Sequence, residues 1–129
     1  MITRFLELAL PLVILILLSA CTQQQFYWGS YEDSLYYRYQ HPGEPGETQS
    51  LSMLADTISE AEQSQAKKVA PGIYADYGYV LFKQGKPDEA VAAWRKEAEL
   101  FPESKHLMDT MISRIQNKNQ NPADERPTP

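Results

Sequence analysis

The sequence predicts an all-α protein, a short bundle of about four main helices preceded by a shorter tyrosine-rich helix. Three observations lead to this fold class. Apolar residues recur at spacings of three and four along most of the chain, as they do on one face of a helix. Prolines and glycines separate these stretches at positions typical of helix starts and ends. No stretch alternates between apolar and polar residues for long enough to indicate a sheet.

The first predicted helix is short and follows Ser30. Ser30 can cap it, with Asp33 three residues later in a capping-box arrangement. Tyr31, Leu35 and Tyr39 then share one face by i, i+4 spacing. The composition of residues 41–46, rich in proline and glycine, is that of a turn or linker.

Four further helices are predicted after this linker. The first covers about residues 48–66, where apolar residues recur at Leu51, Leu54, Ile58 and Ala61. The second runs from Pro71 to Gln84 and ends at Gly85, a residue type suited to a left-handed C-terminal position. Pro87 begins the third and Pro102 ends it. Because these connections are very short, the helices should fold back as antiparallel hairpins.

The last predicted helix covers about residues 103–116. Its apolar stripe consists of Leu107, Met108, Met111, Ile112 and Ile115. Residues 117–129 contain no apolar residue larger than alanine or proline, so we expect a disordered tail.

Residues 71–104 resemble one tetratricopeptide repeat, a helix–turn–helix unit of about 34 residues. Gly78 and Ala90 stand at its small packing sites, and Trp94 stands at its large aromatic site. Glu97 departs from the pattern, which expects alanine there. Either the second helix is slightly rotated or this glutamate meets a partner group. An unrelated helical hairpin is the alternative, and in both cases the flanking helices must close the core, since about three repeats are usually needed for stability.

The first helix of such a repeat lines a concave surface, where Tyr79, Phe82 and Lys83 would face outward. Exposed aromatic side chains favour a protein partner. Alternatively, Tyr79 and Phe82 pack on the preceding helix. The full set of candidate partner-binding residues is Trp28, Tyr31, Tyr79, Phe82, Lys83 and Glu97.

The only cysteine, Cys21, directly follows an apolar run in the order Leu18-Ser19-Ala20-Cys21. This order resembles the lipobox of bacterial lipoproteins. The resemblance implies a signal peptide over residues 1–20, cleavage between Ala20 and Cys21, and a diacylglycerol and an N-acyl lipid on Cys21. The run is shorter than the roughly 20 residues that a spanning helix needs. An ordinary cleaved signal or an uncleaved anchor helix remains the alternative.

Thr22 follows the cysteine where an aspartate would favour retention in the inner membrane, so the resemblance implies an outer-membrane protein facing the periplasm. Residues 21–46 would then form a lipid tether, a Tyr/Trp-rich segment and a linker, and residues 47–116 the helical domain. The net charge of −5 argues against a nucleic-acid partner. It also gives no electrostatic attraction to anionic lipid.

Three stretches together resemble a family of small bacterial lipoproteins that carry a domain of unknown function. They are Tyr27-Trp28-Gly29-Ser30-Tyr31-Glu32, the run from Pro71 to Gly78, and the run from Lys96 to Ser104. Such proteins are typically encoded beside a lipoprotein similar to the curli secretion channel and a second small lipoprotein. The resemblance implies no activity, but it implies those two proteins as partners and makes Glu97 part of the family's pattern.

We therefore expect a non-catalytic, protein-binding accessory subunit of an envelope assembly. A pilotin-like assembly factor and a peptidoglycan-associated regulator are the alternatives. An enzyme such as a wall-modifying hydrolase is disfavoured, because His41 and His106 stand alone and the only thiol would be acylated. No residue spacing indicates a metal site. The sequence therefore predicts no catalytic residue, no metal, no small-molecule substrate, and no cofactor other than the lipid.

Overall fold

The computed structural model describes residues 26–64 and 67–120. The predicted signal peptide, Cys21 and the tail beyond residue 120 lie outside these ranges. Five α-helices and two very short strands make up the described part, which confirms the all-α class. In chain order, the elements are β1 (Phe26–Tyr27), α2 (Tyr31–Gln40), α3 (Glu44–Gln63), β2 (Lys68–Val69), α4 (Ile73–Lys83), α5 (Pro87–Leu100), the 3₁₀ turn η1 (Pro102–Ser104) and α6 (Lys105–Gln120).

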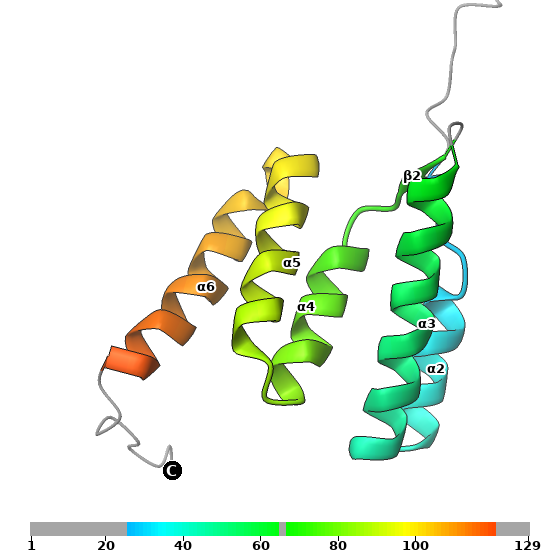
Figure 1. The fold of residues 1–129 in the computed structure, drawn as a ribbon, viewed down its shortest axis with the longest axis horizontal. Coiled ribbons are helices and arrows are strands. Elements are labelled where there is room, and N and C mark those ends of the chain that lie inside the picture. The colour runs from blue at the N-terminus through cyan, green and yellow to red at the C-terminus, as the bar shows by residue number, and fades with distance from the viewer. Residues whose placement is uncertain (1–25, 65–66, 121–129) are drawn as a thin grey trace, which may run out of the picture.

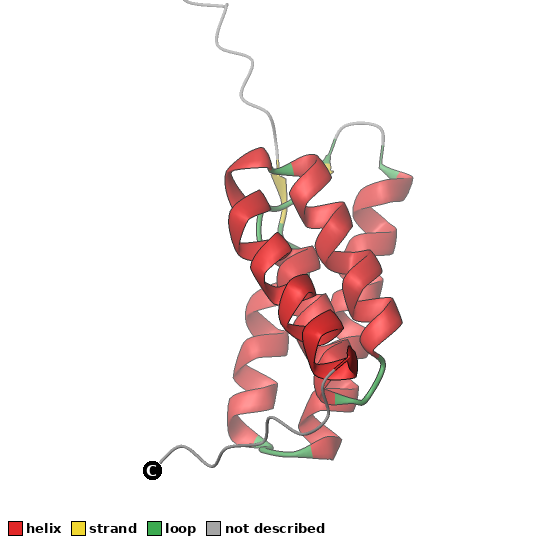
Figure 2. Ribbon diagram, turned by 90° about the vertical axis from the view of Figure 1, so that its left-hand side faces the viewer, coloured by secondary structure: helices red, strands yellow, loops and turns green. Residues whose placement is uncertain are grey.

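The helices follow one another in space in the order of the chain. Each of α2 to α5 packs on the next helix, so the bundle grows by addition of antiparallel neighbours (Figure 1). The second view shows the two strands together near one end of this row of helices (Figure 2). The strands pair in parallel, with Phe26 opposite Lys68 and Tyr27 opposite Val69. This pairing was not predicted, because two-residue strands are too short to show a pattern in the sequence.

Trp94 packs α5 tightly against α4. Its side chain is only 1% exposed, and its indole N–H donates to the Ala75 carbonyl oxygen at 3.0 Å. A Cβ atom added to Gly78 would lie 2.5 Å from Trp94 Nε1, so this glycine leaves the room that the ring occupies. The predicted need for a small residue at Gly78 is confirmed. The resemblance to a tetratricopeptide repeat remains a prediction.

The turn between α4 and α5 is a Schellman motif. Gly85 has φ of 74°, a left-handed conformation that glycine adopts without a steric penalty. The Lys86 N–H donates to the Leu81 carbonyl and the Gly85 N–H to the Phe82 carbonyl, both at 3.0 Å. Pro87 then begins α5, where its missing N–H is not needed. The predicted boundary at Gly85 and Pro87 is confirmed.

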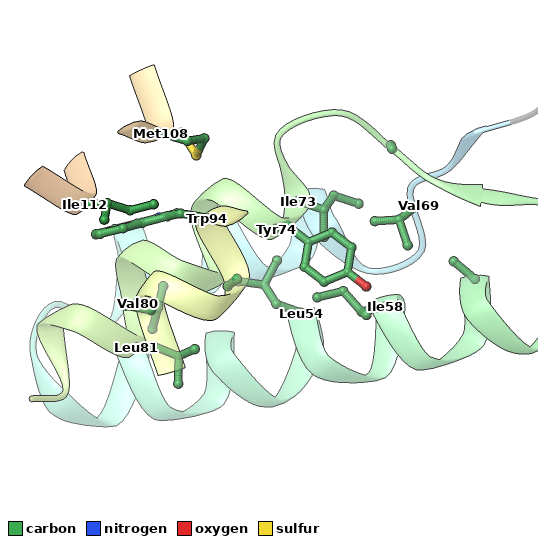
Figure 3. Close-up of a cluster of buried hydrophobic side chains, with 14 of the residues drawn as sticks. Leu54, Ile58, Val69, Ile73, Tyr74, Val80, Leu81, Trp94, Met108 and Ile112 are labelled. Carbon is green, nitrogen blue, oxygen red and sulfur yellow. The ribbon is translucent and has the colours of Figure 1, made fainter. Parts of the chain in front are cut away.

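One apolar core runs through α3, α4, α5 and α6, and β2 covers one end of it (Figure 3). Its largest buried apolar members are Leu54, Ile73, Leu81, Trp94 and Met108. On α6, Ile112 and Ile115 are buried as the predicted stripe requires, but Leu107 is 58% exposed. The helix also continues to Gln120, so residues 117–120 are helical and do not belong to a tail.

The packed face of α2 differs from the one that i, i+4 spacing suggests. Ser34 is fully buried, whereas Leu35 is 39% and Tyr39 is 84% exposed. The Ser34 hydroxyl donates to the Tyr31 carbonyl at 2.7 Å, so this small polar residue can face α3 with its hydrogen bond satisfied. Ser30 occupies the N-cap position, but its side chain makes no capping hydrogen bond.

The second half of the proline- and glycine-rich stretch is helix, and only residues 41–43 form the turn between α2 and α3. Helix α3 begins at Glu44, with Pro45 in its first turn and Gly43 before it at φ of 94°. Gly46 is buried where a Cβ atom would collide with the His41 carbonyl oxygen, which lets α3 start directly against the end of α2. The predicted domain boundary after residue 46 therefore falls inside α3, and α2 belongs to the same packed unit. The helix ends at Gln63, earlier than the predicted residue 66.

Replacement of Trp94 by alanine should lower the free energy of unfolding by about 3–5 kcal/mol, since it removes a large buried ring and leaves a cavity. Chemical denaturation measures the loss. Tyr39→Ala serves as the control, because this ring is 84% exposed and its removal should change stability by no more than about 0.5 kcal/mol. Equal stability of the two variants would contradict the packing described.

Candidate functional site

Helix α5 places the Glu97 carboxylate at the start of α4. Glu97 Oε1 accepts a hydrogen bond from the Gly72 N–H at 2.7 Å. Gly72 is the N-cap residue of α4 and has no side chain with which to cap. The first N–H groups of a helix lack intrahelical acceptors, so Glu97 supplies from a neighbouring helix the acceptor that the glutamate of a capping box would supply locally.

Glu97 is 1% exposed, which decides its role. A side chain buried to this degree cannot contact a partner protein, so Glu97 is not part of an exposed binding surface. Burial raises the pKa of its carboxyl above the ordinary value of 4.5, while hydrogen bonds from the backbone of Gly72, Ala75 and Tyr74 act in the opposite direction. Its second oxygen, Oε2, is buried and has no hydrogen-bond partner among the residues described.

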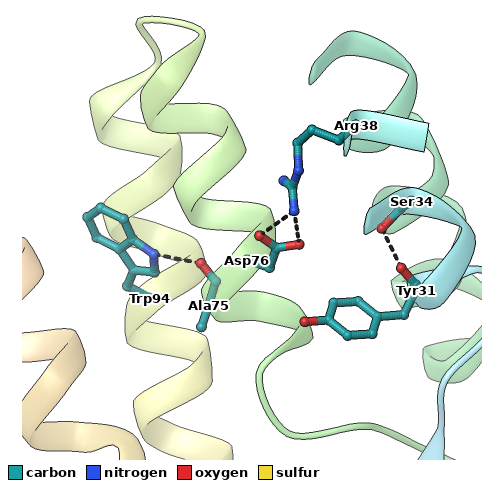
Figure 4. A network of polar contacts seen from close by, with 6 residues as sticks. All are labelled: Tyr31, Ser34, Arg38, Ala75, Asp76 and Trp94. Atoms are coloured by element: carbon teal, nitrogen blue, oxygen red, sulfur yellow. Dashed lines mark hydrogen bonds and ion pairs between the residues drawn. The ribbon is translucent and has the colours of Figure 1, made fainter. Parts of the chain in front are cut away.

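An ion pair joins α2 to α4 beside this carboxylate. Arg38 Nη2 donates to both carboxylate oxygens of Asp76, at 3.0 and 2.8 Å. Both side chains are less than one-fifth exposed, so the pair is more shielded from solvent than an ordinary surface pair. The Tyr31 ring points from α2 toward the same helix (Figure 4). Burial, followed by the charge of Asp76, raises the pKa of the Tyr31 hydroxyl.

The other candidate partner-binding residues fall into two groups. Trp28 is 51% exposed and lies beside Tyr31, with their ring centroids 5.8 Å apart. Tyr31 itself is half-buried against the core.

On α4, Tyr79 is 47% and Phe82 40% exposed. Phe82 lies 6.3 Å from the Trp94 ring, measured between centroids, and Lys83 Nζ lies 3.5 Å from Glu47 on α3.

The structure adds a surface that the sequence did not single out. It is the outer side of α2, called here the α2 face, and consists of Glu32, Asp33, Leu35, Tyr36 and Tyr39. These residues surround a shallow hollow of about 530 Å³. The sequence contained an indication of this surface, because Ser34 and Arg38 lie four residues apart and so share one side of α2. If that side is packed, the large residues on the opposite side must be exposed. Serine and arginine are usually expected to be exposed to solvent, so the exposure of the large rings was not predicted.

The described part of the chain contains neither a metal-binding cluster nor a membrane-spanning helix. In residues 26–64 and 67–120, no three histidine, cysteine or acidic side chains are grouped so that they could hold a metal ion. Over the same ranges, none of the helices combines the length and apolar character that crossing a membrane requires.

The raised pKa of Glu97 predicts a pH effect on stability. The folded protein holds this proton to a higher pH than the unfolded chain does. The contribution of Glu97 to the free energy of unfolding is therefore fully present below about pH 4.5 and decreases as the pH rises through the folded-state pKa. Glu97→Gln should remove this decrease, because its amide oxygen still accepts from Gly72 but carries no charge.

Denaturation of wild type and Glu97→Gln between about pH 4 and pH 7 measures the effect. The stability of the wild type relative to the variant should fall over this interval. Glu99→Gln, whose side chain is 72% exposed, is the control and should keep the wild-type profile. Parallel profiles for wild type and Glu97→Gln would show that the buried carboxylate is not the titrating group.

Among the comparisons with known proteins, a family model matches over most of this fold. No curated protein and no solved structure matches the chain. A family model described as "Domain of unknown function (DUF4810)" matches residues 25–111, which include β1 and every helix from α2 to α5. The match covers more than half of the 129 residues. The chain therefore belongs to the DUF4810 family.

Proposed function

We propose that this protein is a lipid-anchored, non-catalytic subunit of an outer-membrane assembly, and that it binds its partner protein through the α2 face. The observation that carries the proposal is the exposure of large side chains on that face. Tyr36 is 62% and Tyr39 84% exposed, and Leu35 on the same face is 39% exposed. Aromatic residues are enriched at protein interfaces, where they bury much area at small entropic cost.

The α2 face is supported from behind. Ser34 packs toward α3, and Arg38 holds α2 to Asp76 on α4 at 2.8 Å. A surface on a helix that is fixed at two points loses little freedom when a partner binds. Glu32 and Asp33 add negative charge to the same face, which favours a partner with basic groups opposite them.

The anchor is proposed from the resemblance of residues 18–21 to a lipobox. Phe26 of β1 is the fifth residue after Cys21, so a fully extended tether would span at most about 18 Å. An acylated Cys21 would therefore keep the domain close to the membrane. The resemblance to small bacterial lipoproteins supplies the partner, namely a lipoprotein similar to the curli secretion channel.

A double substitution on the α2 face, Tyr36→Ser with Tyr39→Ser, tests the proposal. In cells that produce the full chain together with the channel-like lipoprotein, capture of that partner should fall at least about tenfold, as loss of two interface anchors implies. Leu107→Ser is the matched control, because Leu107 is 58% exposed on α6, away from α2. The Leu107→Ser variant should capture as much of the partner as the wild type does.

Two controls separate recognition from folding and anchoring. The double variant should unfold within about 0.5 kcal/mol of the wild type, because both rings are exposed. Cys21→Ser lacks the thiol to be acylated, so it should not take up palmitate label. Wild-type capture by the double variant would refute the α2 face, and palmitate on Cys21→Ser would refute the anchor.

A further inference from the structure

A second hollow lies at the end of the bundle where β1 and β2 pair. It is formed by the end of α3, the β2 segment, the start of α4 and the end of α5, and has a volume of about 320 Å³. Val69 and Phe101 are buried in its wall, and Leu100 adds apolar surface that is 42% exposed. Three lysines also line it: Lys67, Lys68 and Lys96. We call it the lysine-rimmed cavity.

The charges that face this cavity are mainly positive. Among the described residues that line it, Glu62 is the one acidic side chain, and its Oε1 accepts a hydrogen bond from the Tyr74 hydroxyl at 2.5 Å. Lys96 lies 3.7 Å from Glu99, but both side chains are exposed, so solvent screens this pair. Lys67 lies over the Tyr27 ring, 4.7 Å from its centroid. The hydroxyl of that ring donates a hydrogen bond to Glu60, so an acidic group outside the cavity lining also lies near Lys67.

The cavity lies beside the point where the chain arrives from its N-terminal segment. The ring centroid of Phe26 is 6.1 Å from that of Phe101, a residue of the cavity wall. Figure 1 shows β2 and the adjoining end of α3 at this end of the bundle. Since Phe26 is the fifth residue after Cys21, an acylated Cys21 would lie within about 18 Å of Phe26, the residue beside the cavity wall.

From this geometry we propose that the lysine-rimmed cavity receives the headgroup of an anionic phospholipid from the membrane that holds the protein. This inference rests on the lipid anchor of the proposed function, but not on the partner protein. The three ammonium groups attract the lipid phosphate, and Val69, Leu100 and Phe101 contact its apolar portion. The net charge of −5 does not prevent this binding, because charges more than about 8 Å away are screened at physiological salt.

The acylated protein, purified from envelopes and placed in vesicles, provides the test. Lysine acetylation is followed by mass spectrometry in vesicles of phosphatidylglycerol with phosphatidylethanolamine and in vesicles of phosphatidylcholine. Acetylation should fall in the anionic vesicles only, at Lys67, Lys68 and Lys96, and about 1 M salt should restore it. Lys86, in the turn between α4 and α5, is the internal control and should label equally in both.

Substitutions then test whether these three lysines are responsible for the lipid binding. In neutral detergent, binding of short-chain phosphatidylglycerol should weaken about fivefold for each of Lys67→Gln, Lys68→Gln and Lys96→Gln. Lys86→Gln should bind like the wild type. Equal labelling in both vesicle types, or undiminished lipid binding by the three variants, would overturn the proposal.

The lipid site and the partner-binding role proposed above can fail separately. Neither lipid assay contains the channel-like partner, so loss of partner capture leaves both results unaffected. The mass of the purified protein shows directly whether Cys21 is acylated. If the three lysines are protected in whole envelopes but not in anionic vesicles, their occupant is a protein and the lipid assignment is wrong.

Discussion

The close approach of α4 and α5 at Gly78 is the constraint on which the other contacts depend. The Trp94 ring occupies the space where any other residue at position 78 would carry a side chain. Its indole N–H is satisfied by the Ala75 carbonyl, so the ring is fully buried without an unpaired donor. This contact sets the separation of the two helices, and that separation brings Glu97, further along α5, to the first turn of α4.

Helix α4 is therefore held on several sides by groups of different chemistry. Glu97 of α5 satisfies the N–H of Gly72 at its start. Asp76, in its first turn, receives Arg38 from α2. Helix α2 is thus attached through this ion pair, the buried Ser34 and the half-buried Tyr31. Its other large side chains, among them Tyr36 and Tyr39, stay exposed to solvent.

The sequence predicted the parts of the fold that depend on local signals. Gly85 and Pro87 marked a turn by their backbone preferences alone, and Gly78 and Trp94 marked the close packing by their sizes. It did not predict the packed face of α2, because the burial of Ser34 and the shielding of Arg38 depend on elements distant in the chain. The role of Glu97 was missed for the same reason. No local pattern shows that a glutamate on one helix will meet the uncapped start of another. The lysine-rimmed cavity likewise combines residues from four separate elements.

The stability of Gly78→Ala tests the central constraint most directly, because two effects oppose each other at this position. Helix propensity alone would stabilise the alanine variant by about 1 kcal/mol. The new Cβ would lie 2.5 Å from Trp94 Nε1, and such overpacking costs about 1–3 kcal/mol or more. Chemical denaturation should therefore show that Gly78→Ala is less stable than the wild type. A variant more stable than the wild type would contradict the close packing of Trp94 on Gly78.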